Sequence, residues 1–263
     1  MQNPYYQNMI DSHFHLLSME KKGLDITSIL HSMDELGMEG LEIGLDADDL
    51  GLRSDRFKAY PFIHLSAGIG PWGVKDGMPT LQELLSELDS QLTRHKVAAI
   101  GEIGLDNHHA YGTVHAQEEL MRAQLELARH YGKPVIFHNR EADAQFLSLL
   151  GEQPFPLMGI FHCFQASEEL ALLAMDRGFF LSFAGNLTYN ANKTLQSLFA
   201  KLPLEHLLLE TDSPYLSPNP LRGKPNNPLY IEHLYSYAAQ LRGMEVEALI
   251  EAVRANFHRF LAQ

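Results

Sequence analysis

The strongest constraint on the fold is a regular alternation of short apolar runs with amphipathic segments. The runs occupy residues 9–16, 41–45, 62–69, 97–105, 134–138, 157–163, 179–183 and 206–212. Several of them are almost continuously apolar, which is typical of parallel strands that are buried on both faces. The chain is therefore expected to form a sheet of parallel strands, one from each run.

The segments between these runs carry apolar residues at helical spacing. They lie at 23–37, 80–95, 114–132, 141–150, 167–178 and 190–202, and two more close the chain at 228–241 and 244–262. Gly37, Gly132 and Gly178 stand where helices should end. The weakest helical pattern is 46–60, which is all that the chain offers for the helix of the second repeat.

Eight strand–helix repeats within 263 residues predict a (β/α)8 TIM barrel, folded as a single domain over residues 1–263. The competing fold is a doubly wound open sheet, whose mark is a glycine-rich phosphate loop after an early strand. The sequence contains no such loop. The Pro- and Asn-rich segment 213–230 is flanked by apolar patterns, so we interpret it as an ordered loop and not as a domain boundary.

Composition and charge narrow the class of protein. Hydrophobic residues make up 45% of the chain, which is enough for a packed core. No run approaches the length that spans a bilayer, and the N-terminus lacks the pattern of a signal peptide. A net charge of −13 argues against a general affinity for nucleic acid or anionic membranes. We therefore expect a cytoplasmic protein with no membrane association and no obligate protein partner.

Imidazole and carboxylate side chains gather where the predicted strands end. These residues are His13, His15, Glu102, His138, His162 and Asp212. In a (β/α)8 barrel, active sites form at this end of the strands. Because side chains alternate along a strand, His13 and His15 should face the same way and chelate one ion. A lone histidine is most often a core or surface residue, but this whole set at strand ends predicts a metal site.

The ligand types also indicate which metals fit. Imidazole with carboxylate suits Zn, Mn, Co, Ni or Fe better than Ca, and this many ligands suits a pair of ions. The string EIGLD occurs twice, at 42–46 and 102–106, so either Glu42 or Glu102 could supply a ligand. The alternative for Glu42 is an ordinary polar residue at a strand end, followed by a solvated acidic turn with Asp46, Asp48 and Asp49.

A series of short motifs runs along almost the whole chain. In order they are DSHFHL (11–16), GEIGLD (101–106), Gln117, KPVIFHNR (133–140), HCF (162–164), SFAGNLT (182–188), LLLETDSPYL (207–216), RGKPNNP (222–228) and NFHRF (256–260). In this order and spacing the motifs resemble the TatD family of metal-dependent deoxyribonucleases, within the amidohydrolase-like barrels.

The resemblance implies two divalent metal ions, such as Zn, Mg or Mn. It assigns His13, His15 and Asp212 to one ion, and His138 and His162 to the other, with Glu102 bridging. It thereby favours Glu102 over Glu42. It also makes Asp212 and Glu102 the catalytic residues, with Asp212 a candidate for orienting or deprotonating the attacking water, since an ionised carboxylate beside a metal-bound water can accept its proton.

The same resemblance implies hydrolysis of phosphodiester bonds in DNA, often as an exonuclease acting at strand ends. The candidates for binding this substrate are Arg140, Tyr215, Arg222 and Lys224. Arg222 and Lys224 follow the last predicted strand, where barrels often bind phosphate, and Tyr215 can stack on a base or sugar. The alternative is a Pro-rich cap held by Asn226 and Asn227, with both cations solvated.

The chain departs from the family pattern at three places. Gly70 stands where the family usually has a histidine, and Trp72 where another histidine is common. Gln165 and Ala166 replace the usual Ser-Gly pair. The third departure is Asn107-His108-His109, where aromatic residues are usual; His108 and His109 could reach substrate, but we interpret them as two exposed loop histidines. The first two departures fall at strand ends, so we expect them to line the substrate entrance and to bear on the substrate more than on the metals.

Two rival functions remain open at this point. One is a metal-dependent hydrolase of a small amide, ester, lactone or phosphoester. Such enzymes often use a lysine-derived carbamate between their metals, and Glu102 at the equivalent strand argues against that group. The other rival is a non-catalytic metal-binding scaffold, which has no need for a full set of water-activating ligands.

Overall fold

The computed structural model describes residues 7–152 and 157–262, which form two compact units. The first unit comprises residues 7–42, 60–64 and 182–262, and the second comprises 43–59, 65–152 and 157–181. Strands β3 (Ile63–Ala67) and β7 (Phe180–Phe183) contribute residues to both units. The prediction of one domain over the whole chain stays a prediction.

The first unit is built on strands β1 (Ile10–Phe14), β2 (Glu39–Glu42) and β8 (Leu207–Leu209). β1 pairs with β2 in parallel, and Phe14 forms a parallel bridge with Ser213 just after β8. The Glu210 N–H donates to the carbonyl of Phe183, so the end of β7 lies on the other side of β8. Each apolar run that was predicted to be a strand in this unit is confirmed.

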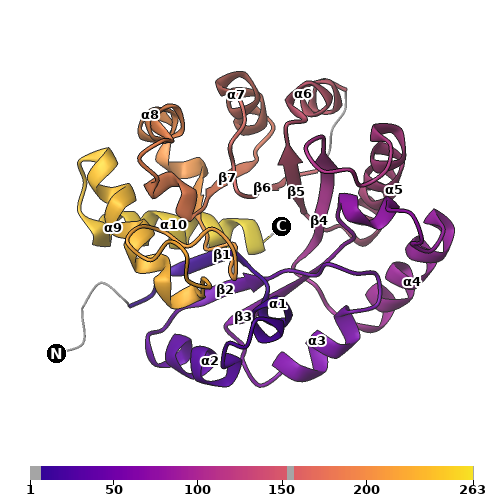
Figure 1. The fold of residues 1–263 in the computed structure, drawn as a ribbon, viewed down its shortest axis with the longest axis horizontal. Helices are drawn as coiled ribbons and strands as arrows, with labels where there is room; N and C mark the ends of the chain where they lie inside the picture. The colour runs from indigo at the N-terminus through magenta and orange to yellow at the C-terminus, as the bar shows by residue number, and fades with distance from the viewer. Residues whose placement is uncertain (1–6, 153–156, 263) are drawn as a thin grey trace. The chain divides into compact units, whose positions relative to one another are not determined.

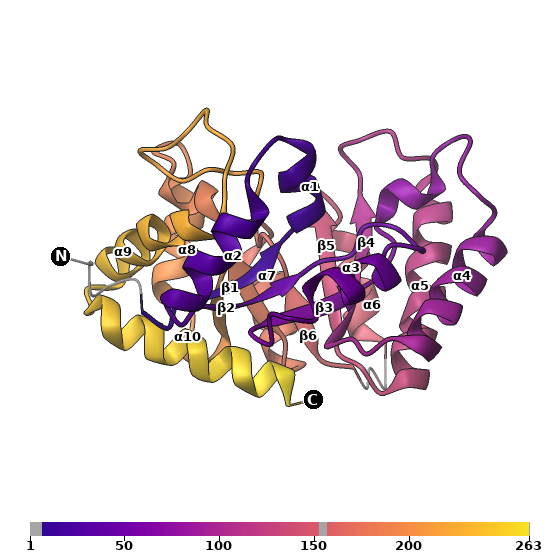
Figure 2. The same cartoon turned by 90° about the horizontal axis from the view of Figure 1, so that it is seen from below.

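The helices of the first unit are α1 (Leu16–Lys21), α2 (Ile26–Glu35), α8 (Lys193–Lys201), α9 (Ile231–Arg242) and α10 (Val246–Leu261). α9 and α10 pack against β8. α10 also packs against β1, and both are labelled in Figures 1 and 2. The Tyr235 hydroxyl of α9 donates to the carbonyl of Ile10, which ties this layer to the first strand. α1 is the one helix of this unit that the sequence pattern did not predict.

The second unit carries strands β4 (Ala99–Asp106), β5 (Val135–Arg140) and β6 (Gly159–Phe161) between β3 and β7. All four adjacent pairs are parallel. The register places Gly104 beside His138 and Phe137 beside Phe161. Within this unit the strands pair in chain order from β3 to β7, as expected for successive strand–helix repeats.

The helices of the second unit are α3 (Leu50–Phe57), α4 (Leu81–Arg94), α5 (Val114–Tyr131), α6 (Asp143–Gly151) and α7 (Glu168–Asp176), all labelled in Figure 1. α4 begins at a capping box, in which Thr80 accepts from the Glu83 N–H and Glu83 accepts from the Thr80 N–H. α5 ends at Gly132, whose φ of 60° is the left-handed conformation that glycine adopts most readily. α5 packs against β4, the longest strand of the sheet.

The weak helical pattern at 46–60 does form α3, and a buried ion pair explains why. Arg53 is fully buried, and its guanidinium donates to the Asp49 carboxylate at 2.9 and 2.6 Å and to the Ser66 carbonyl at 2.8 Å. Asp46 and Asp48 are exposed, as predicted for a solvated acidic turn. Asp49 does not fit that prediction, because its carboxylate also accepts from the Leu45 N–H. Asp49 therefore stabilises the loop after β2 by binding both Leu45 and Arg53.

Candidate metal centre

In the first unit, His13 and His15 present their ring nitrogens to each other. His13 lies in β1 and His15 follows the strand directly, so the alternation of side chains brings both rings to one face. Their Nε2 atoms are 3.2 Å apart, and both side chains are buried. The two rings lie on one side, as the alternation along the strand predicts, and their chelation of one ion stays a prediction.

Asp212 completes this first group. Its Oδ1 lies 3.4 Å from Nε2 of His15 and 3.8 Å from Nε2 of His13. The backbone of Asp212 has a φ of 52°, in the left-handed region that non-glycine residues rarely adopt. Its N–H donates to the carbonyl of His13 at 2.9 Å, which fixes the residue against β1.

Asp11 supports the segment that carries Asp212. Its carboxylate accepts from the Thr211 hydroxyl at 2.6 Å and from the Thr211 N–H at 2.9 Å. Burial raises the pKa of Asp11 well above its usual range, although the bonds from Thr211 oppose the shift. Asp11 and Asp212 therefore differ in role: the former holds the backbone, and the latter turns its carboxylate to the imidazoles.

In the second unit, Glu102, His138 and His162 form an equivalent group. Glu102 lies in β4, His138 in β5, and His162 immediately after β6. Oε2 of Glu102 is 2.8 Å from Nε2 of His162 and 3.7 Å from Nδ1 of His138. The two ring nitrogens are themselves 3.0 Å apart. His138 therefore faces the group through Nδ1, and His162 through Nε2.

Both groups have the donor chemistry and spacing that a divalent ion requires. Each offers two imidazole nitrogens and one carboxylate oxygen, and the largest separation is 3.8 Å in the first group and 3.7 Å in the second. Ligand atoms at about 2.0–2.2 Å from a tetrahedral ion lie roughly 3.5 Å from one another, so the residues present fit such an ion in each group.

Asp106, which sequence reasoning missed, lies behind His138. Its Oδ2 is 3.5 Å from Nε2 of His138 and 2.7 Å from Nδ1 of His109. Burial raises the pKa of Asp106, but the hydrogen bonds from His138 and His109 outweigh it and hold the pKa well below its usual range. The signal was present in the sequence, because Asp106 is an even number of residues from Glu102 along β4 and shares its face.

Gln117, one of the motif residues, holds the end of β4. Its side-chain carbonyl accepts from the Asp106 N–H at 2.8 Å, and its amide donates to the Asp106 carbonyl at 3.1 Å. This pairing gives the Asp106 backbone two partners beyond the sheet, so α5 fixes the strand end that presents Asp106.

The family model and the similar proteins agree on one family for this chain. The family model described as "TatD related DNase" matches residues 10–262. The metal-dependent hydrolase YabD of Bacillus subtilis (strain 168) is 31% identical over 95% of this chain and 98% of its own length. A protein of Edwardsiella piscicida named 3'-5' ssDNA/RNA exonuclease TatD is 30% identical over 94% of this chain and 97% of its own. The chain belongs to the TatD family.

A solved TatD structure supports the fold. The TatD homologue YJJV of Escherichia coli K12 aligns with a TM-score of 0.86 and 26% identity, over 97% of this chain and 98% of that one. The predicted (β/α)8 TIM barrel is confirmed. The relatives also establish this TatD chain as a metal-dependent hydrolase, which the donor groups described above suit chemically.

The glutamates of both EIGLD copies, Glu42 and Glu102, are buried in this TatD chain. Glu42 ends β2 beside Phe14 and is only 1% exposed, so it is not an ordinary solvated residue at a strand end. Glu102 is the one with both imidazoles of the second group within 4 Å of its Oε2. The choice of Glu102 as the ligand stays a prediction that this geometry favours.

Of the four predicted substrate residues, Tyr215 contacts a residue of a donor group and Arg140 follows one closely in sequence. The ring of Tyr215 contacts the His15 ring edge-on at 6.2 Å, and its side chain is 44% exposed. Arg140 ends β5, two residues after His138. Arg222 and Lys224 are exposed, and the Arg222 guanidinium lies 4.2 Å from the centre of the Tyr189 ring. The substrate roles of these four residues stay predictions.

The loop of Arg222 and Lys224 is ordered, as the sequence pattern indicated. The Asn226 amide donates to the carbonyls of Thr211 and Tyr215, and the Asn227 side chain accepts from the Leu229 N–H. Asn226 is fully buried. The same backbone segment that carries Asp212 is therefore held from this loop as well.

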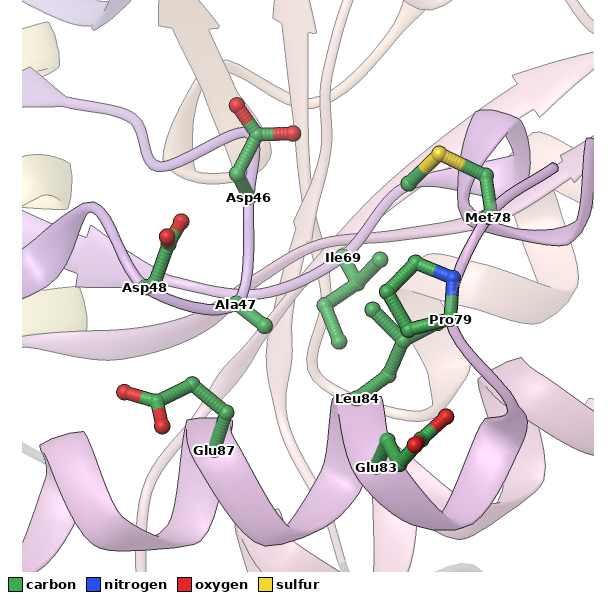
Figure 3. Close-up of a pocket in the computed structure, with 9 residues that line it drawn as sticks. All are labelled: Asp46, Ala47, Asp48, Ile69, Met78, Pro79, Glu83, Leu84 and Glu87. Carbon is green, nitrogen blue, oxygen red and sulfur yellow. The ribbon is translucent and has the colours of Figure 1, made fainter.

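A pocket of about 450 Å³ lies in the second unit between the loop after β2 and α4 (Figure 3). Ile69, Pro79 and Leu84 line its centre, and carboxylates surround it: Asp46, Asp48, Glu83 and Glu87. Like charges repel, so this acidic pocket is unsuited to a phosphate backbone. Among the described residues, no helix combines the length and apolar character needed to cross a membrane.

Proposed function

We propose that this chain is a divalent-metal-dependent deoxyribonuclease that shortens DNA from a strand end. The observation that carries the proposal is the pair of donor groups, each with two imidazoles and a carboxylate. We assign one ion to His13, His15 and Asp212, and a second to Glu102, His138 and His162. Paired divalent ions suit in-line displacement at phosphorus, since they stabilise both the attacking and the leaving oxygen.

A bound divalent ion supplies positive charge that polarises the phosphodiester and lowers the pKa of water. The residues of the chain contribute position and proton transfer. His13 and His15 would hold the first ion. The Asp212 carboxylate is 13% exposed, so it can accept a proton from water. The Glu102 side chain is more deeply buried than that of Asp212, which suits a carboxylate that binds an ion and does not exchange protons with water.

The charge of the chain supports action at a strand end. With 33 acidic and 20 basic residues, the protein carries a net charge of −13 and would not coat a long polyanion. Arg140, two residues after His138, and the exposed Arg222 are the cations that we assign to phosphate binding. The name of the Edwardsiella piscicida relative, a ssDNA/RNA exonuclease at 30% identity, points the same way.

The test is digestion of end-labelled single-stranded DNA with Mg, Mn or Zn added in separate reactions. We expect stepwise shortening that stops when the metal is chelated, and no shortening by Asp212→Asn. Labels at the 5' and 3' ends in separate reactions give the direction. Intact oligonucleotide in every metal, with turnover of a small ester or lactone by the same preparation, would refute the nuclease and favour the small-molecule hydrolase.

A further inference from the structure

Trp72 occupies the space that a side chain at position 70 would fill. It lies in the short 3-10 turn Pro71–Val74 that follows β3. A Cβ at Gly70 would overlap three carbons of the indole ring. The indole N–H donates to the carbonyl of Leu45 at 2.9 Å, which fixes the ring in this position. The glycine and the tryptophan are therefore one structural feature and not two separate departures from the family pattern.

The indole lies directly beside a proposed metal ligand. Its ring contacts the His138 ring edge-on, with centroids 6.1 Å apart and an interplanar angle of 82°. On another side it contacts Tyr111, at 6.4 Å. Tyr111 stacks on His109 with centroids 5.2 Å apart, and the Lys75 ammonium lies 4.5 Å from the centre of the Tyr111 ring. We call Trp72, His109, Tyr111 and Lys75 the aromatic platform.

The platform is partly open to solvent. Trp72 and Tyr111 are half-buried, whereas His109 and Lys75 are exposed. Aromatic rings interspersed with a cation are the usual means of binding an unpaired nucleic acid strand, because every base has a face that can stack. Ring packing alone would account for Trp72 and Tyr111, but it would not require a lysine over the ring or a location against His138.

We propose that Trp72 is the residue on which a base next to the scissile phosphodiester stacks, and that the rest of the platform continues this surface. The inference rests on the proposed function and deepens it by naming how the substrate is chosen. Bases in a duplex are already stacked on their neighbours, so a platform of this kind favours an unpaired end. Trp72 thereby determines specificity through contact with the substrate and leaves the metal-coordinating groups unchanged.

The chain offers its own probe, because Trp72 is its only tryptophan. With the metal removed, oligo(dT) is titrated into the wild-type protein while indole fluorescence and the anisotropy of a labelled strand are both recorded. We expect fluorescence quenching that saturates together with the anisotropy. An oligonucleotide that lacks its bases but keeps its phosphates should bind more weakly and leave the fluorescence unchanged.

A second experiment compares substrates that carry or lack a base at the terminal nucleotide. Loss of a stacked base weakens binding by roughly 5- to 100-fold, so wild-type kcat/KM should differ by about that factor between the two substrates. Trp72→Ala should abolish the difference, and Trp72→Phe should keep most of it. His130→Ala, an exposed aromatic residue of α5 outside the platform, is the control and should behave as wild type.

Gly70→Ala tests the same idea by moving the ring instead of removing it. It should impair base discrimination in the wild type and have no further effect in a Trp72→Ala background, where the colliding ring is gone. Circular dichroism checks that each variant is folded.

The outcomes separate the two proposals. An equal base preference in wild type and Trp72→Ala, or bound oligonucleotide with unchanged indole fluorescence, overturns the platform. If wild type cleaves no phosphodiester but its fluorescence is quenched by bases, stacking on Trp72 stands and the nuclease proposal fails. If the metal-free wild type binds no oligonucleotide, the platform fails, and the metal-dependent digestion alone decides the nuclease proposal.

Discussion

The carboxylate of Asp106 lies 3.5 Å from Nε2 of His138, on the side of the ring opposite the donor group. A carboxylate in this position sets which ring nitrogen carries the proton and so leaves Nδ1 free to bind a metal. Two backbone N–H groups, those of His108 and His109, also donate to Asp106 and hold it in place.

Asp106→Asn should therefore weaken the affinity for one of the two proposed ions by about 10- to 100-fold, the usual cost of losing such a partner. Titration of the metal-free protein with Zn or Mn by calorimetry measures it. Asp46→Asn changes the same residue in the other copy of EIGLD, where the side chain is exposed, and should leave the affinity unchanged. Equal affinities for Asp106→Asn and wild type would show that Asp106 has only a structural role.

The two glutamates of the repeated motif should differ in their effect on catalysis. Glu102→Gln is expected to lower kcat by at least about 100-fold, because it removes a ligand or proton-transfer group, with little change in the unfolding midpoint. Glu42→Gln, which keeps the shape of an equally buried side chain, should retain most of the activity. Similar losses in both variants would mean that the ligand has been assigned to the wrong residue or that both glutamates bind metal.

Two neighbouring aspartates in the acidic turn after β2 should differ in their contribution to the free energy of unfolding. Asp49→Ala leaves the buried Arg53 guanidinium without its carboxylate, and breaking a buried pair in this way costs about 3–5 kcal/mol. Asp48→Ala, one residue away and exposed, should change the free energy of unfolding by no more than about 0.5 kcal/mol. Urea denaturation of the three proteins measures both changes. A small effect of Asp49→Ala would contradict the conclusion that Asp49 stabilises this loop.

His64 should make the protein less stable in mild acid. Burial, and to a lesser extent the nearby His258, lowers the pKa of His64, although Glu39 opposes the shift. Because the folded-state pKa is below the unfolded value near 6.5, the unfolded chain binds more protons in acid, and stability falls as pH drops below about 6.5. The ring packs against Phe257, so His64→Phe should reduce this loss between pH 7.5 and 5. His115→Gln, on an exposed face of α5, should show the wild-type slope in the same urea titrations.

The sequence predicted the strands and the donor residues because both follow from local rules. A short apolar run with a polar residue at its end marks a buried parallel strand and its functional edge, and His13, His138 and Asp212 were found in this way. α1 escaped prediction because six residues are too few to show a helical period. Asp49 and Arg53 have the i,i+4 spacing of a helical ion pair, but the spacing does not show that Arg53 is buried against the Ser66 carbonyl. The role of Trp72 depends on Leu45 and His138, which are distant along the chain.

The exclusion between Gly70 and the indole of Trp72 also restricts how this chain can have changed over time. With the indole hydrogen-bonded to Leu45, a side chain at position 70 can be accommodated only if the ring is displaced from its place beside His138. A glycine at 70 is therefore what lets a tryptophan at 72 keep this position, and a change at either residue alters the constraint on the other.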